Sequence, residues 1–200
     1  MLGIGKVQIC NMALAYSGGG QISAFDEATE QGRLCRVWYD LARQETLQQA
    51  DWSFARMKQT LASHADAPPQ SWAFRYIPPA DLVAIRYLAK PSTTDVEDEI
   101  AYEMLLDDAG NVVTLCTDLD EAAAIYTRNQ ESVVLFSPMF VDALAMVLAG
   151  KLIIPMSEDI EKAEGFIKTI PNAVQKAHAL DLMQGQPKAE RDASYIRARG

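Results

Sequence analysis

Residues 31–57 (QGRLCRVWYDLARQETLQQADWSFARM) constrain the fold more than any other part of the sequence. Between Leu34 and Asp51 the run contains neither glycine nor proline and consists mostly of good helix formers, so we expect a long helix that ends near Ala50. Apolar residues recur in it at helical spacing, which predicts a buried side formed by Leu34, Val37, Trp38, Leu41 and Leu47. The remaining faces should carry Arg33, Arg36, Asp40, Arg43, Gln44 and Glu45.

The character of the chain changes directly after this helix. Trp52 and Phe54 are two aromatic residues separated by Ser53, a pattern that suits a pleated, half-buried strand better than another helical turn. A long amphipathic helix would then lead directly into an extended segment with large side chains to anchor. We interpret this region as the joint between a helical bundle and a β-structured region.

Three further helices are predicted, one before this region and two after it. Residues 6–16 form a short helix that should end at Ser17 and the three glycines after it. Ser137-Pro138 has the form of a helix start, and residues 140–150 are apolar nearly all round, as in a buried central helix. In the last helix, predicted to run to Gln184 with a kink at Pro171, the apolar positions step by three and four: Ile160, Ala163, Ile167, Ile170, Val174 and Ala177.

Strands are predicted between the helices. The candidate segments are residues 72–77, 81–88, 100–106, 111–116 and 122–128, and residues 107–110 form a hairpin loop that ends in glycine. The predicted fold class is therefore α+β in a single domain of residues 1–200. About four helices form an antiparallel bundle (1–54 and 136–185), a small antiparallel sheet is inserted at 55–131, and a tail follows at 186–200.

The charge of the chain restricts its possible partners. The net charge of −9 argues against a general nucleic-acid binder, which should carry a basic face, although DNA could still slide past an acidic surface. Cys10, Cys35 and Cys116 are too few and too scattered for a disulfide framework or a zinc site. The N-terminus has no apolar signal-peptide core, and residues 140–150 are too short to span a bilayer, so we expect a soluble intracellular product without membrane contact.

No catalytic constellation, cofactor or metal site is predicted. His64 and His178 are far apart in the chain and are expected to be plain surface or edge histidines. Acidic clusters occur at residues 95–99, 107–108 and 118–121. A cation site built from such loops is conceivable, but none has the spacing of a calcium loop. Cys116 is expected to be a small core residue.

The C-terminal residues differ from the acidic body. Lys188, Arg191, Arg197 and Arg199 face only Glu190 and Asp192, and Tyr195 and Ile196 are the large apolar residues there. A tail of this kind either is disordered or docks on a partner.

Several local signatures together resemble one protein family. These are Asn11-Met12-Ala13-Leu14-Ala15 before the glycine-rich turn, Phe25-Asp26-Glu27, the helix with Cys35, Tyr39-Asp40 and Ala42-Arg43, Asp51-Trp52-Ser53-Phe54-Ala55, the Phe136-Ser-Pro-Met-Phe140 helix start that leads to Ala143-Leu144-Ala145 and Leu148-Ala149, and the tail from Asp192 to Arg199. With these features the chain resembles bacteriophage head-to-tail connector (adaptor) proteins of the podovirus tail tubular protein A family. The likeness covers nearly the whole chain, and its motifs are structural rather than chemical.

This resemblance implies a structural protein of the virion head-tail junction, assembled in the host cytoplasm and not an enzyme. Such proteins form a ring, usually of 12 copies, between the portal protein and the tail tube or nozzle protein, and they help to retain packaged DNA, which passes through the channel without sequence-specific binding. The C-terminal segment would contact the portal, with Arg191, Tyr195, Ile196, Arg197 and Arg199 as the expected binding residues. Aromatic and arginine side chains are also what interfaces favour.

Two other functions remain open at the level of sequence. A DNA-binding packaging or regulatory protein would use Arg33, Arg36 and Arg43 on the long helix, and its retention of DNA would depend on salt. An uncharacterised enzyme with a site in the acidic loops would be stabilised by a specific divalent metal.

Overall fold

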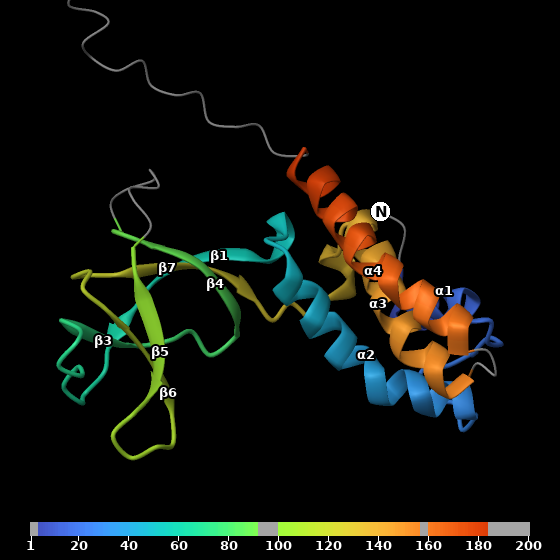
Figure 1. Cartoon of the computed structure of the whole chain (residues 1–200), viewed down its shortest axis with the longest axis horizontal. Helices are drawn as coiled ribbons and strands as arrows, with labels where there is room; N and C mark the ends of the chain where they lie inside the picture. The colour runs from blue at the N-terminus through green and yellow to red at the C-terminus, as the bar shows by residue number, and fades with distance from the viewer. Residues whose placement is uncertain (1–3, 92–99, 157–159, 184–200) are drawn as a thin grey trace, which may run out of the picture.

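A computed structural model describes residues 4–91, 100–156 and 160–183. Within them it contains four α-helices and two small antiparallel sheets, an α+β fold (Figure 1). The helices are α1 (Lys6–Ser17), α2 (Glu30–Gln49), α3 (Pro138–Met156) and α4 (Ile160–Leu182). The strands are β1 (Arg56–Thr60), β2 (Ala62–Ser63), β3 (Phe74–Ile77), β4 (Leu82–Ala89), β5 (Tyr102–Leu106), β6 (Val113–Thr117) and β7 (Ala123–Arg128), and the short 3-10 turns are η1 (Ser53–Ala55) and η2 (Val133–Leu135).

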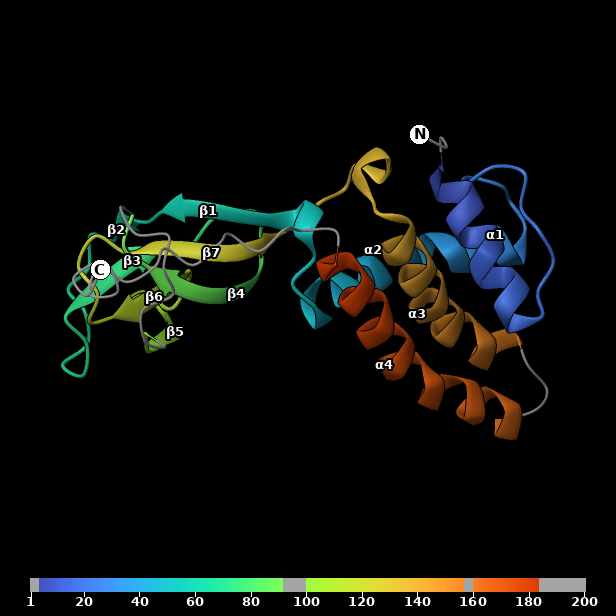
Figure 2. The same cartoon turned by 90° about the horizontal axis from the view of Figure 1, so that it is seen from above.

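The molecule is elongated, with the helices at one end and the strands at the other (Figures 1 and 2). The chain crosses from helices to strands after α2 and returns after β7. These crossings lie side by side, because β1 pairs with β7 in a register that places Arg56 opposite Thr127. The strands therefore form one continuous excursion of the chain between α2 and α3.

Helix α3 is the centre of the helical core, where it contacts α1, α2 and α4. Residues 140–150 were expected to be too short to span a bilayer, but they belong to a longer helix. Helix α3 continues to Met156, and by length and composition alone it could cross a membrane, so the expectation does not hold for the whole helix. However, 61% of its apolar window is buried against the other helices, which is the pattern of a core helix.

Helix α2 begins after Thr29, whose side chain accepts a hydrogen bond from the backbone N–H of Gly32 at 3.2 Å and caps the helix. Its buried side differs from the prediction. Val37 and Leu41 are 57% and 44% exposed, whereas the buried residues are Gly32, Leu34, Cys35, Tyr39, Ala42, Arg43, Thr46 and Leu47. The inward face is turned relative to the apolar stripe, so part of that stripe remains on the surface.

The segment directly after α2 was expected to be a strand, and that prediction was wrong. Ser53, Phe54 and Ala55 form the turn η1, and the first strand begins at Arg56. The aromatic rings explain the difference, because Trp52 and Phe54 pack on Phe140 of α3 rather than lying on a sheet. The tight turn lets both rings reach the same helix.

The other helices largely follow the predictions. Helix α1 ends with Gly18 in the left-handed conformation (φ 76°), as predicted for the glycine-rich turn. In the predicted seam of α4, Ala163, Val174 and Ala177 are buried, but Ile160 is 72% exposed and does not belong to it. The predicted C-terminal tail, residues 186–200, lies outside the described residues.

The strands form two sheets instead of the single small sheet that was predicted. One has the order β1-β7-β4 and the other β2-β3-β6-β5, and all pairings are antiparallel. The hairpin predicted at residues 107–110 joins β5 to β6, and Gly110 has a φ of 72° in its turn. A separate core of the strands is built around Leu61, Tyr76, Leu88, Leu115 and Tyr126.

Strand β4 contains two irregularities that connect it to the helices. Its register against β7 shifts between Leu82 and Ala84 and again between Ile85 and Tyr87, which leaves Val83 and Arg86 as the extra residues. Such bulges re-aim side chains. Val83 packs on the helical core, and Arg86 reaches the end of α2.

Candidate functional site

The joint between the two parts is anchored by Trp52, which is fully buried. Its indole Nε1 donates a hydrogen bond to the carbonyl oxygen of Thr46 at 2.7 Å, near the end of α2. The ring lies edge-on to Phe140 of α3, with 5.0 Å between centroids, and to His178 of α4 at 5.8 Å. His178 was expected to be a plain surface or edge histidine, but it is half-buried against this indole. Trp52 thus connects the end of α2 to two other helices.

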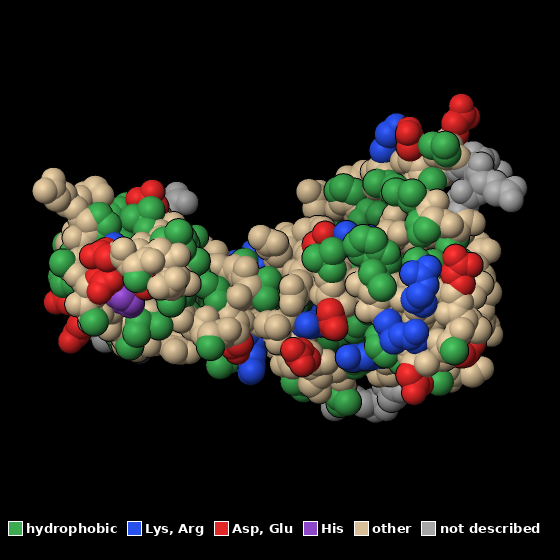
Figure 3. Space-filling view, turned by 90° about the horizontal axis from the view of Figure 1, so that it is seen from below, with side chains coloured by type: hydrophobic (Ala, Val, Ile, Leu, Met, Phe, Trp, Pro, Cys, Tyr) green, Lys and Arg blue, Asp and Glu red, His purple; other side chains and the backbone are tan. Residues whose placement is uncertain are grey.

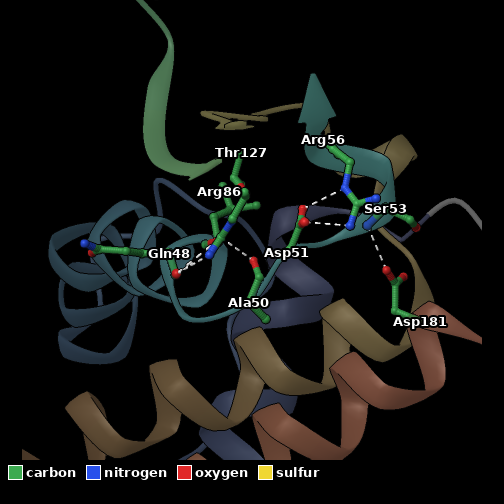
Figure 4. Close-up of polar contacts among 9 residues, drawn as sticks. Gln48, Ala50, Asp51, Ser53, Arg56, Arg86, Thr127 and Asp181 are labelled. Carbon is green, nitrogen blue, oxygen red and sulfur yellow. Dashed lines mark hydrogen bonds and ion pairs between the residues drawn. The ribbon is translucent and has the colours of Figure 1, made fainter. Parts of the chain in front are cut away.

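Arg86 makes the main polar connection from the strands to α2 (Figure 4). Its Nη2 donates to the carbonyl oxygens of Leu47 at 2.9 Å and Ala50 at 2.5 Å, and its Nε donates to Oγ1 of Thr127 at 2.8 Å. The last carbonyls of a helix lack partners within the helix and form the negative end of its dipole. Burial lowers the pKa of Arg86 below its ordinary value, but an arginine remains charged at neutral pH. Arg86 therefore caps α2 from outside.

Two further polar contacts complete the joint (Figure 4). The backbone N–H of Ser53 donates to Oδ2 of the buried Asp181, at the end of α4, at 2.8 Å. Arg56 at the start of β1 pairs with Asp51, and its Nε lies 3.0 Å from the carboxylate. The turn η1 is thus fixed on both sides.

Arg43 fixes the second crossing of the chain. This α2 residue is 2% exposed, and its Nη1 donates to Oδ1 of Asn129 at 2.7 Å and to the carbonyl oxygen of Gln130 at 2.8 Å. The side chain of Gln130 in turn accepts a hydrogen bond from the backbone N–H of Ser132 at 3.0 Å. Arg43 therefore holds the segment that leads into η2.

The turn η2 carries two apolar side chains on the surface. Val133 packs on the helical core and Phe136 is buried, whereas Val134 and Leu135 are 69% and 54% exposed. Figure 2 shows this turn in gold, projecting between the end of β7 and the start of α3. Adjacent large apolar side chains on a fixed projection are suited to contact with another protein.

A groove lies between α2 and α3 and has a volume of about 550 Å³. We call it the α2–α3 groove, and it is lined by Arg33, Leu34, Val37, Trp38, Gly150, Lys151, Ile154 and Pro155. A second hollow of about 490 Å³, to which α4 also contributes, shares Gly150 and Lys151 as lining residues. In Figure 3, hydrophobic side chains gather over the helical part of the surface, among Lys, Arg, Asp and Glu.

The charged groups of the α2–α3 groove are mainly basic. Lys151 Nζ lies 2.9 Å from Oε1 of Glu45 and 5.6 Å from the centroid of the Trp38 ring. Arg33 is exposed on the opposite wall. The floor of the groove is apolar, so it suits an apolar side chain that arrives with a carboxylate beside it.

The three arginines of the DNA-binding alternative do not share one face. Arg33 lines the α2–α3 groove. Arg36 donates to the carbonyl oxygens of Phe25 at 3.1 Å and Glu27 at 2.8 Å, whereas Arg43 is buried. The helical pattern had placed Arg43 on an outer face, and that placement was wrong. The predicted portal-binding residues Arg191, Tyr195, Ile196, Arg197 and Arg199 lie outside the described residues.

One group of titratable residues has the composition of a cation site. Ligand-type atoms of His64, Asp66 and Asp107 lie within 4.8 Å of one another. They are already engaged, because His64 Nδ1 accepts a hydrogen bond from the backbone of Asp66, and Asp66 Oδ2 accepts one from the backbone of Asp108, both at 3.1 Å. The buried Arg75 lies 2.7 Å from Asp108 and 3.6 Å from Asp66, and the bond to Asp108 raises its pKa. The guanidinium of Arg75 thus supplies the positive charge for this acidic group. The contacts of Asp66 and Asp108 hold the loop after β2 against the β5–β6 hairpin.

The other acidic clusters have local roles where they are described. Asp118 accepts a hydrogen bond from the backbone N–H of Ala73 at 2.9 Å, and Asp120 accepts one from that of Glu121 at the same distance. The acidic cluster at residues 95–99 lies outside the described residues. Cys116 is fully buried in β6, as predicted.

Sequence reasoning did not single out Arg86, Asn129, Val134 or Leu135. A usable signal existed for Arg86, because it is the one charged residue in the run LVAIRYLA. For the turn, Val133, Val134 and Leu135 form an apolar run just before the helix start at Ser137-Pro138. No model of a protein family matches the chain, and no curated protein is similar to it in sequence.

Proposed function

We propose that this chain is a structural virion protein that forms a ring between the portal and the tail tube or nozzle of a bacteriophage. In this role it helps to retain packaged DNA and forms part of the channel through which DNA is ejected. The proposal starts from the resemblance of its sequence signatures to the tail tubular protein A family. The observation that carries it furthest is a pair of exposed apolar surfaces, η2 and the α2–α3 groove, on rigidly joined elements.

The elongated shape supports the same role. Helices and strands lie at opposite ends of the molecule (Figure 1), so each end is available to a different partner. In the proposed ring, of about 12 copies, the helices form antiparallel bundles packed side by side around the channel. The C-terminal segment with Arg191, Tyr195, Ile196, Arg197 and Arg199 contacts the portal, and loops of the β region face the tail.

The charge of the chain suits a channel that DNA passes without being held. A net charge of −9 repels phosphates, whereas a protein that grips DNA needs a basic face. The three α2 arginines of the DNA-binding alternative are directed to separate places, one of them into the protein interior. The structural role is therefore favoured over DNA binding.

The test is the mass of the purified protein by light scattering, alone and mixed with the portal ring from the same genome. A species that joins the portal in multiple copies, forming a ring, would support the proposal. A protein that ignores the portal in both states would refute it. If that protein also retained DNA in a salt-dependent manner, the DNA-binding alternative would be favoured.

A further inference from the structure

We infer that the turn η2 of one copy inserts Val134 and Leu135 into the α2–α3 groove of the neighbouring copy. This inference rests on the ring proposed above and names the surfaces that form it. It commits to a second copy of this chain as the occupant of the groove.

The two surfaces match in shape and polarity. The groove is a hollow of about 550 Å³ with a largely aliphatic and aromatic lining, a size typical of pockets that enclose apolar groups. The turn offers two adjacent apolar side chains that are mostly exposed in the single chain. Both surfaces lose apolar contact with water when they meet, which favours association.

The turn is held in its projecting form before any contact is made. The backbone N–H of Leu135 donates to the carbonyl oxygen of Ser132 at 3.1 Å, and that of Phe136 donates to Val133 at the same distance. Arg43 fixes the preceding segment through Gln130. A preorganised turn loses little conformational entropy on binding, so more of the contact energy is retained. Arg43 is thus a positioning residue for η2.

The charges around the two surfaces are complementary. Glu131 lies beside the turn, its side chain is 73% exposed, and its carboxylate is 4.0 Å from Arg43. The groove presents the exposed Arg33 on one wall, whereas Lys151 on the other wall is already paired with Glu45 at 2.9 Å. When the turn enters the groove, the carboxylate of Glu131 arrives on the side of Arg33, and such pairing favours the correct partner and orientation.

The positions of the surfaces suit a ring. Figure 2 shows η2 and α4 on opposite sides of α3, and the groove shares Gly150 and Lys151 with the hollow that α4 lines. Each copy therefore carries a projection and a receptor in different places. Contacts of this head-to-tail kind produce closed rings or filaments rather than two-fold dimers.

The first experiment replaces the apolar tip of the turn. Leu135→Asp should leave the monomer folded, because this side chain is 54% exposed, but should abolish multi-copy assembly on the portal measured by light scattering. Leu106→Asp is the matched control, because Leu106 is 56% exposed on β5, and it should assemble as the unmodified protein does. Circular dichroism would confirm that both variants are folded.

The second experiment exchanges charges across the contact. Glu131→Arg alone and Arg33→Glu alone should each raise the protein concentration needed for assembly about tenfold or more. The two variants mixed in equal amounts should assemble again, since alternating copies would pair opposite charges at every contact. The double variant in one chain should also assemble.

The outcomes separate this inference from the proposed function. If the unmodified protein and Leu135→Asp both form rings on the portal, the ring stands and the η2 contact is overturned. If Val37→Asp in the groove blocks docking of single copies on the portal while Leu135→Asp does not, the groove binds the portal and the inference is wrong. If the unmodified protein never joins the portal, the proposed function fails and this inference fails with it.

Discussion

At the scale of single residues, three arginines connect distant segments, of which Arg43 and Arg75 are buried and Arg86 is half-buried. Arg43 and Arg86 each donate to backbone carbonyl oxygens of a distant segment, and Arg75 joins two acidic loop residues. The planar guanidinium has five donors in fixed directions, so it can satisfy several acceptors at once. Arg43 and Arg86 lie at the two crossings between helices and strands, and both crossings are therefore fixed by a charged side chain.

Trp52 gives the first prediction. Trp52→Ala should lower the free energy of unfolding by about 3–5 kcal/mol, because a fully buried indole is lost from contacts with Phe140 and His178. Denaturant unfolding measures this change. Trp72→Ala is the control and should cost about 1 kcal/mol or less, since its indole bonds to Glu103 at an exposed position. Equal losses for the two variants would contradict the anchoring role of Trp52.

Tyr126 gives a prediction for alkaline pH. Its hydroxyl donates to Oδ1 of Asp81 at 2.9 Å, and burial together with this bond raises its pKa from about 10 to about 12. The folded state therefore keeps a proton that the unfolded state has lost between these values. The contribution of this proton to stability is complete below pH 10 and is lost as the pH rises to 12, a change of about 2–3 kcal/mol.

The test compares the unmodified protein with Tyr126→Phe by denaturant unfolding at pH 9 and pH 11.5. Phenylalanine has no proton to lose, so the difference in unfolding free energy between the two proteins should shrink at the higher pH. A difference that stays constant would show that the hydroxyl is not held in its protonated form by the fold.

At the scale of elements, Arg86 determines how α2 ends. Arg86→Met should lower the free energy of unfolding by about 1.5–3 kcal/mol, because the carbonyls of Leu47 and Ala50 lose a charged partner. Hydrogen exchange should become faster in the last turn of α2 and in β4. Arg56→Met is the control: it breaks a half-exposed pair with Asp51 and should cost about 1 kcal/mol or less. An unchanged exchange rate in α2 would show that Arg86 is not its cap.

The sequence predicts the helices better than their orientation. Helix bounds follow from propensity, capping residues and glycines, which are local properties, and the ends of α1 and α2 agree with them. The buried face of α2 depends on where α1, α3 and the β region lie. The hydrophobic pattern therefore missed that Val37 is exposed and that Arg43 and Thr46 are buried.

The same limit applies to the strands and to the candidate surfaces. Strand β1 has the sequence RMKQT with every residue exposed, so no alternating pattern marks it, and only its pairing with β7 makes it a strand. Strand β4 was predictable from its apolar run, but the bulges that aim Val83 and Arg86 at the helices are set by its pairing. The α2–α3 groove joins residues more than 100 positions apart, and no local pattern reports such proximity.

At the scale of the whole molecule, the described helices and strands form two apolar cores among themselves. Every described helix and strand lies between Lys6 and Leu182. Deleting residues 187–200 should therefore leave a folded monomer with an unchanged circular dichroism spectrum and unfolding midpoint. Under the proposed function, the truncated protein should no longer dock on the portal.

The tail residues that drive docking can be tested separately. Tyr195→Ala with Ile196→Ala should weaken docking nearly as much as the deletion, because aromatic and apolar anchors dominate most interfaces. Light scattering of each variant with the portal ring measures this. A truncated protein that still docks would show that the anchor lies elsewhere in the chain.

The central position of α3 also has a consequence for synthesis in the cell. Residues 56–128 leave the ribosome before α3 and can pair their strands at once, since β1 and β7 complete a sheet without it. Helices α1 and α2 must instead wait for α3, for a time on the order of 5–20 s at ordinary rates of translation. Throughout that interval their apolar sides lack the helix on which they mainly pack. The apolar sides of α1 and α2, which are buried in the finished molecule, are therefore the surfaces most open to aggregation and to chaperones while the chain is being made.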